Sequence, residues 1–198
     1  MNTDLLFSSY PFISGDRVTL TRITELDLEA LWDIWGDEEN YRFWPTAALP
    51  APAECARQLR QADQRFREKR SVLLGIYPNG AGQTLAGVLK LYGIDPRVEA
   101  LSLQVMVAQK HQGRGYGSGA VEAAAQYLFQ RVGARRLQAF VLPIDKAGAM
   151  TLERCGFVKE GTLREAFLWP DKGLVDLTLY SLLRSDRKQK TSTAQYYL

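Results

Sequence analysis

The hydrophobic and polar positions of this chain follow two periods, and segments of the two kinds take turns along the sequence. Residues 17–23 alternate branched and polar side chains, which predicts a strand with one buried face. In residues 28–35 the apolar side chains recur at helical spacing, which predicts an amphipathic helix. Thr24 and Asp27 stand before that helix as a capping box in which an aspartate replaces the usual glutamate. The chain therefore opens with a strand that leads into a helix.

The rest of the chain continues as strands and helices, without repeats or an internal linker. Pro50 and Pro52 introduce a second helix, over residues 53–70, whose narrow apolar stripe lies among many charges. The patterns that follow predict one α+β domain with a mixed, mostly antiparallel sheet of about seven strands. The further elements expected are strands at 71–77, 84–92, 100–107, 137–142, 157–169 and 174–183, and helices at 121–132, ended by Gly133, and at 146–155.

Composition and charge narrow the class of protein only slightly. At 198 residues the chain has the size of one ordinary domain, and its 46% hydrophobic and 24% charged residues are typical of a globular protein. The formal net charge of +3 is too small and too dispersed to predict binding to nucleic acid. A basic run at residues 184–190 is typical of a solvated terminus. We therefore expect an N-terminal extension at 1–13, a single domain at 14–184 and a polar basic tail at 185–198.

The same composition argues against several kinds of site and location. Cys55 and Cys155 form no disulfide framework, and the single histidine, His111, has no partner for a zinc site or a catalytic triad, so no metal is expected. Residues 1–10 lack the basic and apolar regions of a signal peptide, and no run of about 18 apolar residues could span a membrane. We expect a cytoplasmic protein that binds neither membrane nor nucleic acid, and a homodimer stays open.

Residues 105–119 carry the most specific chemistry, because a strand runs there into a basic, glycine-rich loop and then into a helix. Glycines let a backbone approach a ligand closely, and the N–H groups that begin a helix attract phosphate, which favours a pyrophosphate site. Gly115-x-Gly117-x-x-Ala120 also fits the dinucleotide fingerprint, but no acidic residue follows in the next strand. A Walker A run is absent from the sequence. The dinucleotide site and a turn without any ligand stay open as alternatives.

Gln112-x-x-Gly115-x-Gly117 resembles the Gln/Arg-x-x-Gly-x-Gly/Ala signature of the GNAT superfamily of acetyltransferases. The resemblance implies acetyl-CoA as co-substrate, an amine as acceptor, and a twisted sheet with helices on both faces and a splayed central strand pair. Further segments between residues 14 and 184 resemble the RimJ/RimL-like branch of ribosomal-protein alanine N-acetyltransferases, in the right order. These segments are 15–20 with 24–27, 152–161, 163–166 and 175–183.

The resemblance places the cofactor mainly on backbone groups. In the superfamily the pantetheine arm lies in the splayed gap as if it were a strand, which implies bonds from the backbone of Val105, Met106 and Val107. An N–H there, assigned to Val107, would polarise the acetyl carbonyl as an oxyanion donor. Lys110 would add positive charge. The other expected cofactor residues are Gln112, Gly113, Arg114, Gly115, Tyr116, Gly117, Ser118 and Asp145.

The sequence departs from the family where relatives carry their catalytic side chains. Asp145 and Gly148 stand where an Asn and a Ser are common, and Asp145 can cap a helix but cannot donate a hydrogen bond to CoA. Leu152 replaces the tyrosine that protonates the leaving thiolate, and Phe167 replaces the RimL-type glutamate base. No catalytic acid or base is therefore carried over from the family.

Acetyl transfer can still proceed, because orientation alone can supply roughly 7–11 kcal/mol of the barrier and a general base typically adds about 10²–10⁴-fold. Glu165 and Asp176 are the candidates for a base that acts through water, since their strands are expected to border the acceptor cleft. Each has a structural alternative: Glu165 as a solvent-facing sheet residue, and Asp176 as a partner of a neighbouring loop. We expect direct transfer to a primary amine of a protein N-terminus or a small molecule. A non-catalytic acyl-CoA-binding module is the alternative.

Overall fold

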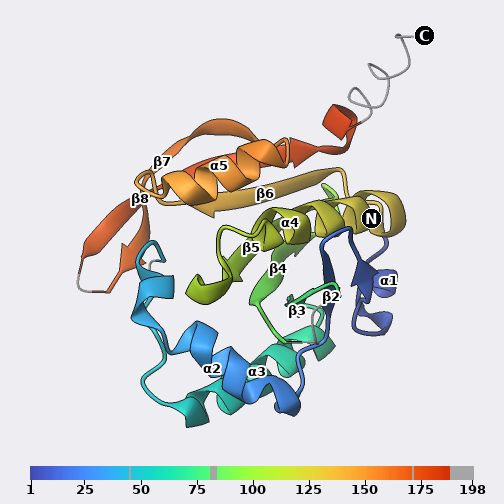
Figure 1. Ribbon diagram of the computed structural model, residues 1–198. Coiled ribbons are helices and arrows are strands. Elements are labelled where there is room, and N and C mark those ends of the chain that lie inside the picture. The colour runs from blue at the N-terminus through green and yellow to red at the C-terminus, as the bar shows by residue number, and fades with distance from the viewer. Residues whose placement is uncertain (45, 81–83, 171, 188–198) are drawn as a thin grey trace.

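The computed structural model describes residues 1–44, 46–80, 84–170 and 172–187, and these form one eight-stranded sheet with helices on both faces (Figure 1). The strand order is β1-β2-β3-β4-β5-β6-β8-β7, and neighbouring strands are antiparallel except for β5 and β6. The expected mixed, mostly antiparallel α+β sheet is confirmed. The strands are β1 Ile13–Ser14, β2 Val18–Thr21, β3 Val72–Pro78, β4 Gly87–Asp95, β5 Ala100–Val107, β6 Arg136–Val141, β7 Val158–Trp169 and β8 Gly173–Leu183.

The sheet has one strand more than expected, because β1 is a two-residue strand that is too short to show an alternating pattern in the sequence. Residues 1–13, expected as an extension, contain a short helix whose Leu6 and Phe7 are buried in the main core. Residues 81–83, between the strands expected at 71–77 and 84–92, and residues 188–198 of the expected tail lie outside the described residues. Among the residues described, no helix is long and apolar enough to cross a membrane.

The helices lie close to where the sequence predicts them, with one correction. The helix expected at 121–132 begins at Tyr116 and ends in a π-helical turn, after which Gly133 takes the expected left-handed conformation (φ +81°). The capping box of Thr24 and Asp27 is present, and the Asp27 carboxylate accepts from the Thr24 N–H at 2.8 Å. The helices are α1 Thr3–Ser8, α2 Leu28–Trp35, α3 Pro52–Arg67, α4 Tyr116–Tyr127 and α5 Lys146–Arg154, with short turns η1 Glu25–Asp27, η2 Glu38–Tyr41, η3 Gln109–His111 and the π-helical η4 Leu128–Val132.

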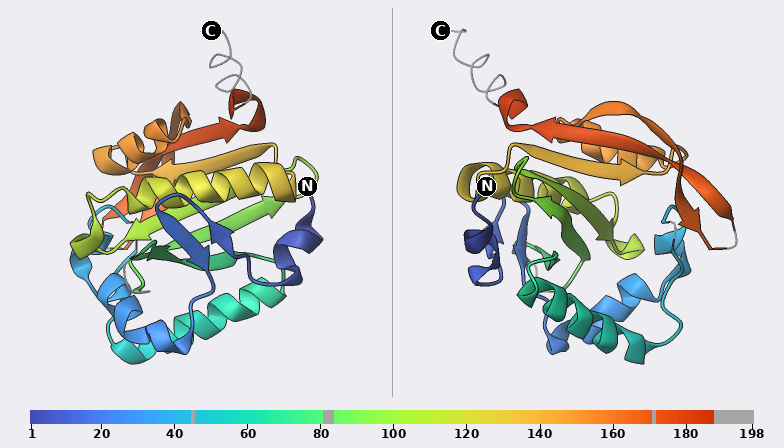
Figure 2. Two further views of the ribbon diagram at one scale, coloured as in Figure 1. Left: turned by 45° about the vertical axis from the view of Figure 1, so that its right-hand side comes forward. Right: turned by 180° about the vertical axis from the view of Figure 1, so that it is seen from behind.

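The two faces of the sheet bury two separate hydrophobic cores. Alternate residues of β3 point to opposite faces, as expected of an extended strand. Val72, Leu74 and Ile76 join the main core, which includes α4, whereas Leu73 and Tyr77 belong to the second core beneath α2 and α3. Figure 2 shows α2 and α3 gathered on one side and α4 on the other. The helix that follows the glycine loop is thus fixed against the centre of the sheet.

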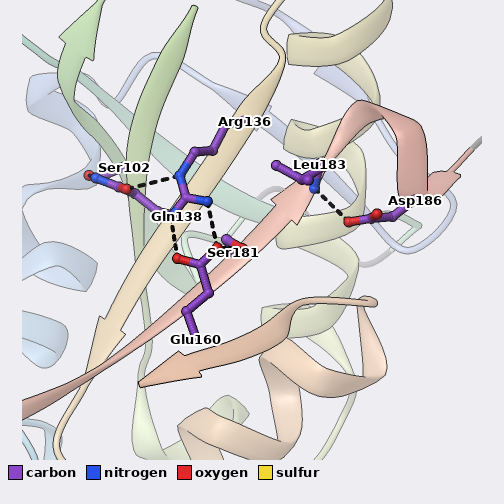
Figure 3. A network of polar contacts seen from close by, with 7 residues as sticks. All are labelled: Ser102, Arg136, Gln138, Glu160, Ser181, Leu183 and Asp186. Carbon is purple, nitrogen blue, oxygen red and sulfur yellow. Dashed lines mark hydrogen bonds and ion pairs between the residues drawn. The ribbon is translucent and has the colours of Figure 1, made fainter. Parts of the chain in front are cut away.

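A network of polar side chains ties β5, β6, β7 and β8 together (Figure 3). Gln138 donates to Ser102 across the β5–β6 pair at 3.1 Å. Arg136 forms two hydrogen bonds of 2.6 Å with the Glu160 carboxylate, which also accepts from the Ser181 hydroxyl at 2.6 Å. Because Ser102 and Gln138 are the last register pair between their strands, this network braces the end at which β5 and β6 are still joined.

Candidate active site

The central strands β5 and β6 open into a wedge. Their parallel pairing extends only from Ala100 to Ser102 on β5, although β5 continues to Val107 and β6 continues to Val141. The expected splayed pair is therefore present, and it opens toward the glycine loop that follows β5. Backbone groups in such an opening are available to a ligand that lies along the strand.

The direction of the β5 backbone shows which groups face this wedge. The Ala108 N–H donates to the Ala86 carbonyl beside β4 at 2.9 Å. Along an antiparallel pair, the backbone N–H and C=O groups of alternate residues face the same neighbouring strand. We therefore infer that the backbone groups of Met106, two residues before Ala108, also face β4. Those of Val105 and Val107 face the wedge. The Val107 carbonyl accepts from the Gln112 side-chain amide at 3.0 Å, in agreement with that direction.

The glycine loop closes the open end of the wedge and leads directly into α4. Gly113 and Gly115 have φ of +74° and +78°, which a residue with a Cβ adopts only with strain. Gly115 is the N-cap of α4, so the first-turn amides follow it at once. A Cβ at Gly117 would lie 3.5 Å from Val107 Cγ2 and 3.9 Å from Val105 Cγ1. The N-terminus of α4 therefore lies beside the two strand residues that face the wedge.

The basic side chains around the loop differ in charge and in ion pairing. Lys110 forms an ion pair with Asp33 of α2, so part of its charge is neutralised within the protein. Arg114 is exposed. Burial lowers the pKa of His111, and the neighbouring Lys110 and Arg114 lower it further. His111 is consequently expected to be neutral near pH 7, which leaves the loop cations as the charges that could meet a phosphate.

The residues on α5 have structural roles. The Asp145 carboxylate accepts from the Gly148 N–H at 2.8 Å and so caps the helix, as its charge and position allow. Leu152, at the position where relatives carry a tyrosine, is 5% exposed and belongs to the main core. Neither residue supplies an acid for the departing thiolate.

Glu165 and Asp176 lie together on the β7–β8 hairpin, where they line an open hollow with Thr162, Leu163 and Arg164. Asp176 Oδ1 accepts from the backbone N–H of Glu165 at 2.8 Å. Glu165 has a φ of +50° and lies in a break of the strand register between Leu163 and Phe167. Its side chain is exposed. Asp176 therefore stabilises a bulge of β7. This contact is of the kind expected if Asp176 serves as a structural partner of a neighbouring segment.

Several aromatic residues at the end of α2 and just after it pack mainly against the core beneath α2 and α3. Trp35, Tyr41 and Trp44 are partly buried against the second core, and burial raises the pKa of Tyr41 to about 12. A second open hollow lies between the end of α2 and the loop after β5, and its lining includes Asp33 and Asp37. In the described part of the chain, no group of three or more His, Cys, Asp or Glu side chains is arranged to hold a metal ion.

Comparison with known proteins agrees with this arrangement. A family model for the acetyltransferase (GNAT) domain matches residues 17–158. The chain belongs to the GNAT acetyltransferase family. The match includes β5, the glycine loop, α4 and β6, so the wedge and the helix N-terminus lie within the GNAT domain.

Individual GNAT relatives are distant in sequence. The chain is 22% identical to an uncharacterized N-acetyltransferase, YoaA, of Bacillus subtilis over 88% of this chain and 98% of that protein. It is 29% identical to a spermidine N(1)-acetyltransferase of Vibrio cholerae over 77% of this chain and 86% of that protein. The structure of a spermidine N-acetyltransferase from Vibrio cholerae in complex with CoA and spermine superposes with a TM-score of 0.73 at 20% identity, covering 85% of this chain and 96% of that chain. This structural likeness shows a shared fold.

Proposed function

We propose that this GNAT protein transfers the acetyl group of acetyl-CoA directly to a primary amine. The observation that carries the proposal is the juxtaposition of the β5–β6 wedge with the N-terminus of α4, capped by Gly115 in a left-handed conformation. A helix N-terminus preceded by such a loop suits a pyrophosphate, and an open strand edge suits the amides of a pantetheine arm.

In this proposal the loop from Gln112 to Ser118 binds the pyrophosphate through its backbone amides. Backbone groups of Val105 and Val107 form hydrogen bonds with the pantetheine arm, and the Val107 N–H polarises the acetyl carbonyl. The amine nitrogen attacks the carbonyl carbon, the C–S bond breaks, and CoA leaves as the thiolate. The amine proton passes to solvent, directly or through a relay. Gln112 contributes its side chain as well, because its bond to the Val107 carbonyl fixes the end of β5 next to the reacting group.

The acceptor is a protein N-terminus or a small-molecule amine. The segments that resemble the RimJ/RimL-like branch favour a protein N-terminus, whereas the curated spermidine acetyltransferase favours a polyamine. Asp37, in the hollow beside the loop, is compatible with either cationic acceptor, whereas Asp33 in the same hollow is paired with Lys110.

The test is release of CoA thiol from acetyl-CoA in the presence of three amine classes: N-terminal peptides, polyamines and free amino acids. Mass spectrometry should show one added acetyl group on an amine of the preferred class, with one thiol released for each product. Tight binding of acetyl-CoA without turnover on any class would contradict catalysis and would support the non-catalytic acyl-CoA-binding module. Absence of CoA binding would contradict both.

A further inference from the structure

The turn between β1 and β2 reaches the N-terminus of α4 from a distant part of the sequence. Ser14 pairs with Thr19, and the Gly15 N–H donates to the Val18 carbonyl at 2.9 Å. This register leaves Asp16 and Arg17 as the two central residues of a tight hairpin turn. Arg17 thus stands at the tip of the hairpin.

Asn79, just after β3, holds this turn in place. Its backbone N–H donates to the Arg17 carbonyl at 2.9 Å, and its side-chain amide donates to the Gly15 carbonyl at 2.8 Å. The Thr19 hydroxyl donates to the Asn79 side-chain oxygen at 3.0 Å. These three bonds fix the backbone from which the Arg17 side chain extends.

Two glycines let the turn pack directly on α4. A Cβ at Gly15 would lie 2.8 Å from Ala123 Cβ, and a Cβ at Gly119 would lie 3.3 Å from Arg17 Cβ. Larger residues at these positions would push the turn and the helix apart. The aliphatic part of Arg17 consequently runs along the first turns of α4.

The guanidinium of Arg17 ends beside Gly115, the N-cap of α4. A Cβ at Gly115 would lie 3.6 Å from Arg17 Cδ, 3.7 Å from Nη1 and 3.8 Å from Nε. Arg17 is exposed, and within the described ranges no carboxylate forms an ion pair with it. By contrast, Arg22 and Arg136 each form an ion pair with a carboxylate. The fold therefore delivers a guanidinium, without an acidic partner in the described chain, to the turn where a phosphate is expected.

We propose that Arg17 binds a phosphate group of CoA at the first turn of α4, an inference that rests on the proposed function. A guanidinium donates two parallel hydrogen bonds to a phosphate, a geometry that a lysine cannot reproduce. Its charge adds to the positive end of the helix dipole, which alone binds anions weakly. Either the pyrophosphate or the 3′-phosphate of CoA supplies the required chemistry.

The experiment measures binding of CoA and of 3′-dephospho-CoA by calorimetry to the wild type, Arg17→Gln and Arg131→Gln. Arg131 is the matched control, because it is an exposed cation in η4, the turn that continues α4 at its opposite end. We expect Arg17→Gln to weaken CoA binding by about 10- to 100-fold, the range for hydrogen bonds to a charged group, and Arg131→Gln to bind as the wild type does. The salt dependence of CoA affinity should also become shallower in Arg17→Gln alone.

The two cofactors identify the phosphate. Equal losses for CoA and dephospho-CoA would place Arg17 on the pyrophosphate, and a loss confined to CoA would place it on the 3′-phosphate. If Arg17→Gln binds both cofactors like Arg131→Gln, with the same salt dependence, the proposal is overturned while CoA binding by the wild type still supports the proposed function. Arg17→Lys retains the aliphatic stem and the charge, so it should melt like the wild type and keep part of the affinity, even if Arg17→Gln folds poorly.

Discussion

Asp176 offers a direct test of how the acceptor side handles protons. Its carboxylate accepts the Glu165 N–H at 2.8 Å, and Glu165 is held at a φ of +50° in the bulge of β7. A residue with a Cβ in this conformation is strained by roughly 1–2 kcal/mol. A charge-assisted hydrogen bond at a partly exposed site contributes about 1 kcal/mol, which is enough to hold the bulge against most of that strain. If this is the role of Asp176, a neutral acceptor oxygen at this position should preserve part of the function.

Asp176→Asn keeps an acceptor oxygen and removes the charge, whereas Asp176→Ala removes both. A neutral hydrogen bond is roughly half as strong, so the loss of about 0.5 kcal/mol should reduce kcat/KM by only about two-fold in Asp176→Asn. Asp176→Ala should lose about 1 kcal/mol, or about five-fold, mainly through KM for the amine. The assay is initial velocity against amine concentration from pH 6 to pH 9, with CoA affinity measured in parallel.

A second substitution separates the bulge from the chemistry. Glycine adopts a positive φ without strain, so Glu165→Gly should restore much of the activity when combined with Asp176→Ala. The pH profile should rise toward the pKa of the amine and keep its shape in Asp176→Asn. Equal losses of about 10²–10⁴-fold in Asp176→Asn and Asp176→Ala, with CoA binding intact, would identify Asp176 as the general base and refute this reasoning.

Two further predictions concern the loop and the polar network. Gly115→Ala and Gly133→Ala introduce the same strain, because both positions have φ near +80°, but only Gly115→Ala should lower CoA affinity, by at least about 10-fold in calorimetry; equal affinities would separate the loop from the cofactor. Hydrogen bonds from Arg136 lower the pKa of Glu160 from 4.5 to about 2, so the stability it contributes is complete above pH 4.5 and is lost as the pH falls toward 2. Glu160→Gln should therefore destabilise the fold by about 1–2 kcal/mol at pH 7 and converge with the wild type in acid, whereas Glu68→Gln, in an exposed pair, should change little in urea unfolding.

Local sequence patterns predict most of the helices and strands, because these elements depend on interactions between residues that are close in the sequence. The alternation in residues 17–23 and the capping box at Thr24 both act within a few residues, and both are present. The start of α4 was misplaced because Gly117 and Gly119 disfavour a helix by propensity. In the structure their lack of a side chain admits Val105, Val107 and the β1–β2 turn, so tertiary packing compensates for the lower propensity.

In the candidate site, too, features with a local sequence motif could be predicted, and features formed by distant segments could not. The glycine loop could be predicted because a contiguous motif carries it, and the splayed strand was implied by the resemblance of that motif to the GNAT signature. The bond between Gln138 and Ser102 could not, because it joins strands that are far apart in sequence and has no local signature. The sequence of β5 also could not show that the backbone groups of Met106, unlike those of Val105 and Val107, face away from the wedge. Their direction follows from the pairing of β5 with β4.

Asp176 and Glu165 show that a titratable residue beside an open hollow can also have a structural role. Their residue types and their strands made them candidates for a base, and the structure brings them together in an open hollow. What the sequence could not reveal is the break in the β7 register, which turns one backbone N–H toward the carboxylate. An acceptor that already holds a strained turn is poorly suited to moving a proton, because protonating it would weaken the bond that shapes the cleft. In the proposed reaction we therefore expect the rate to depend on orientation and on the acidity of the amine itself, and the pH profile tests this expectation.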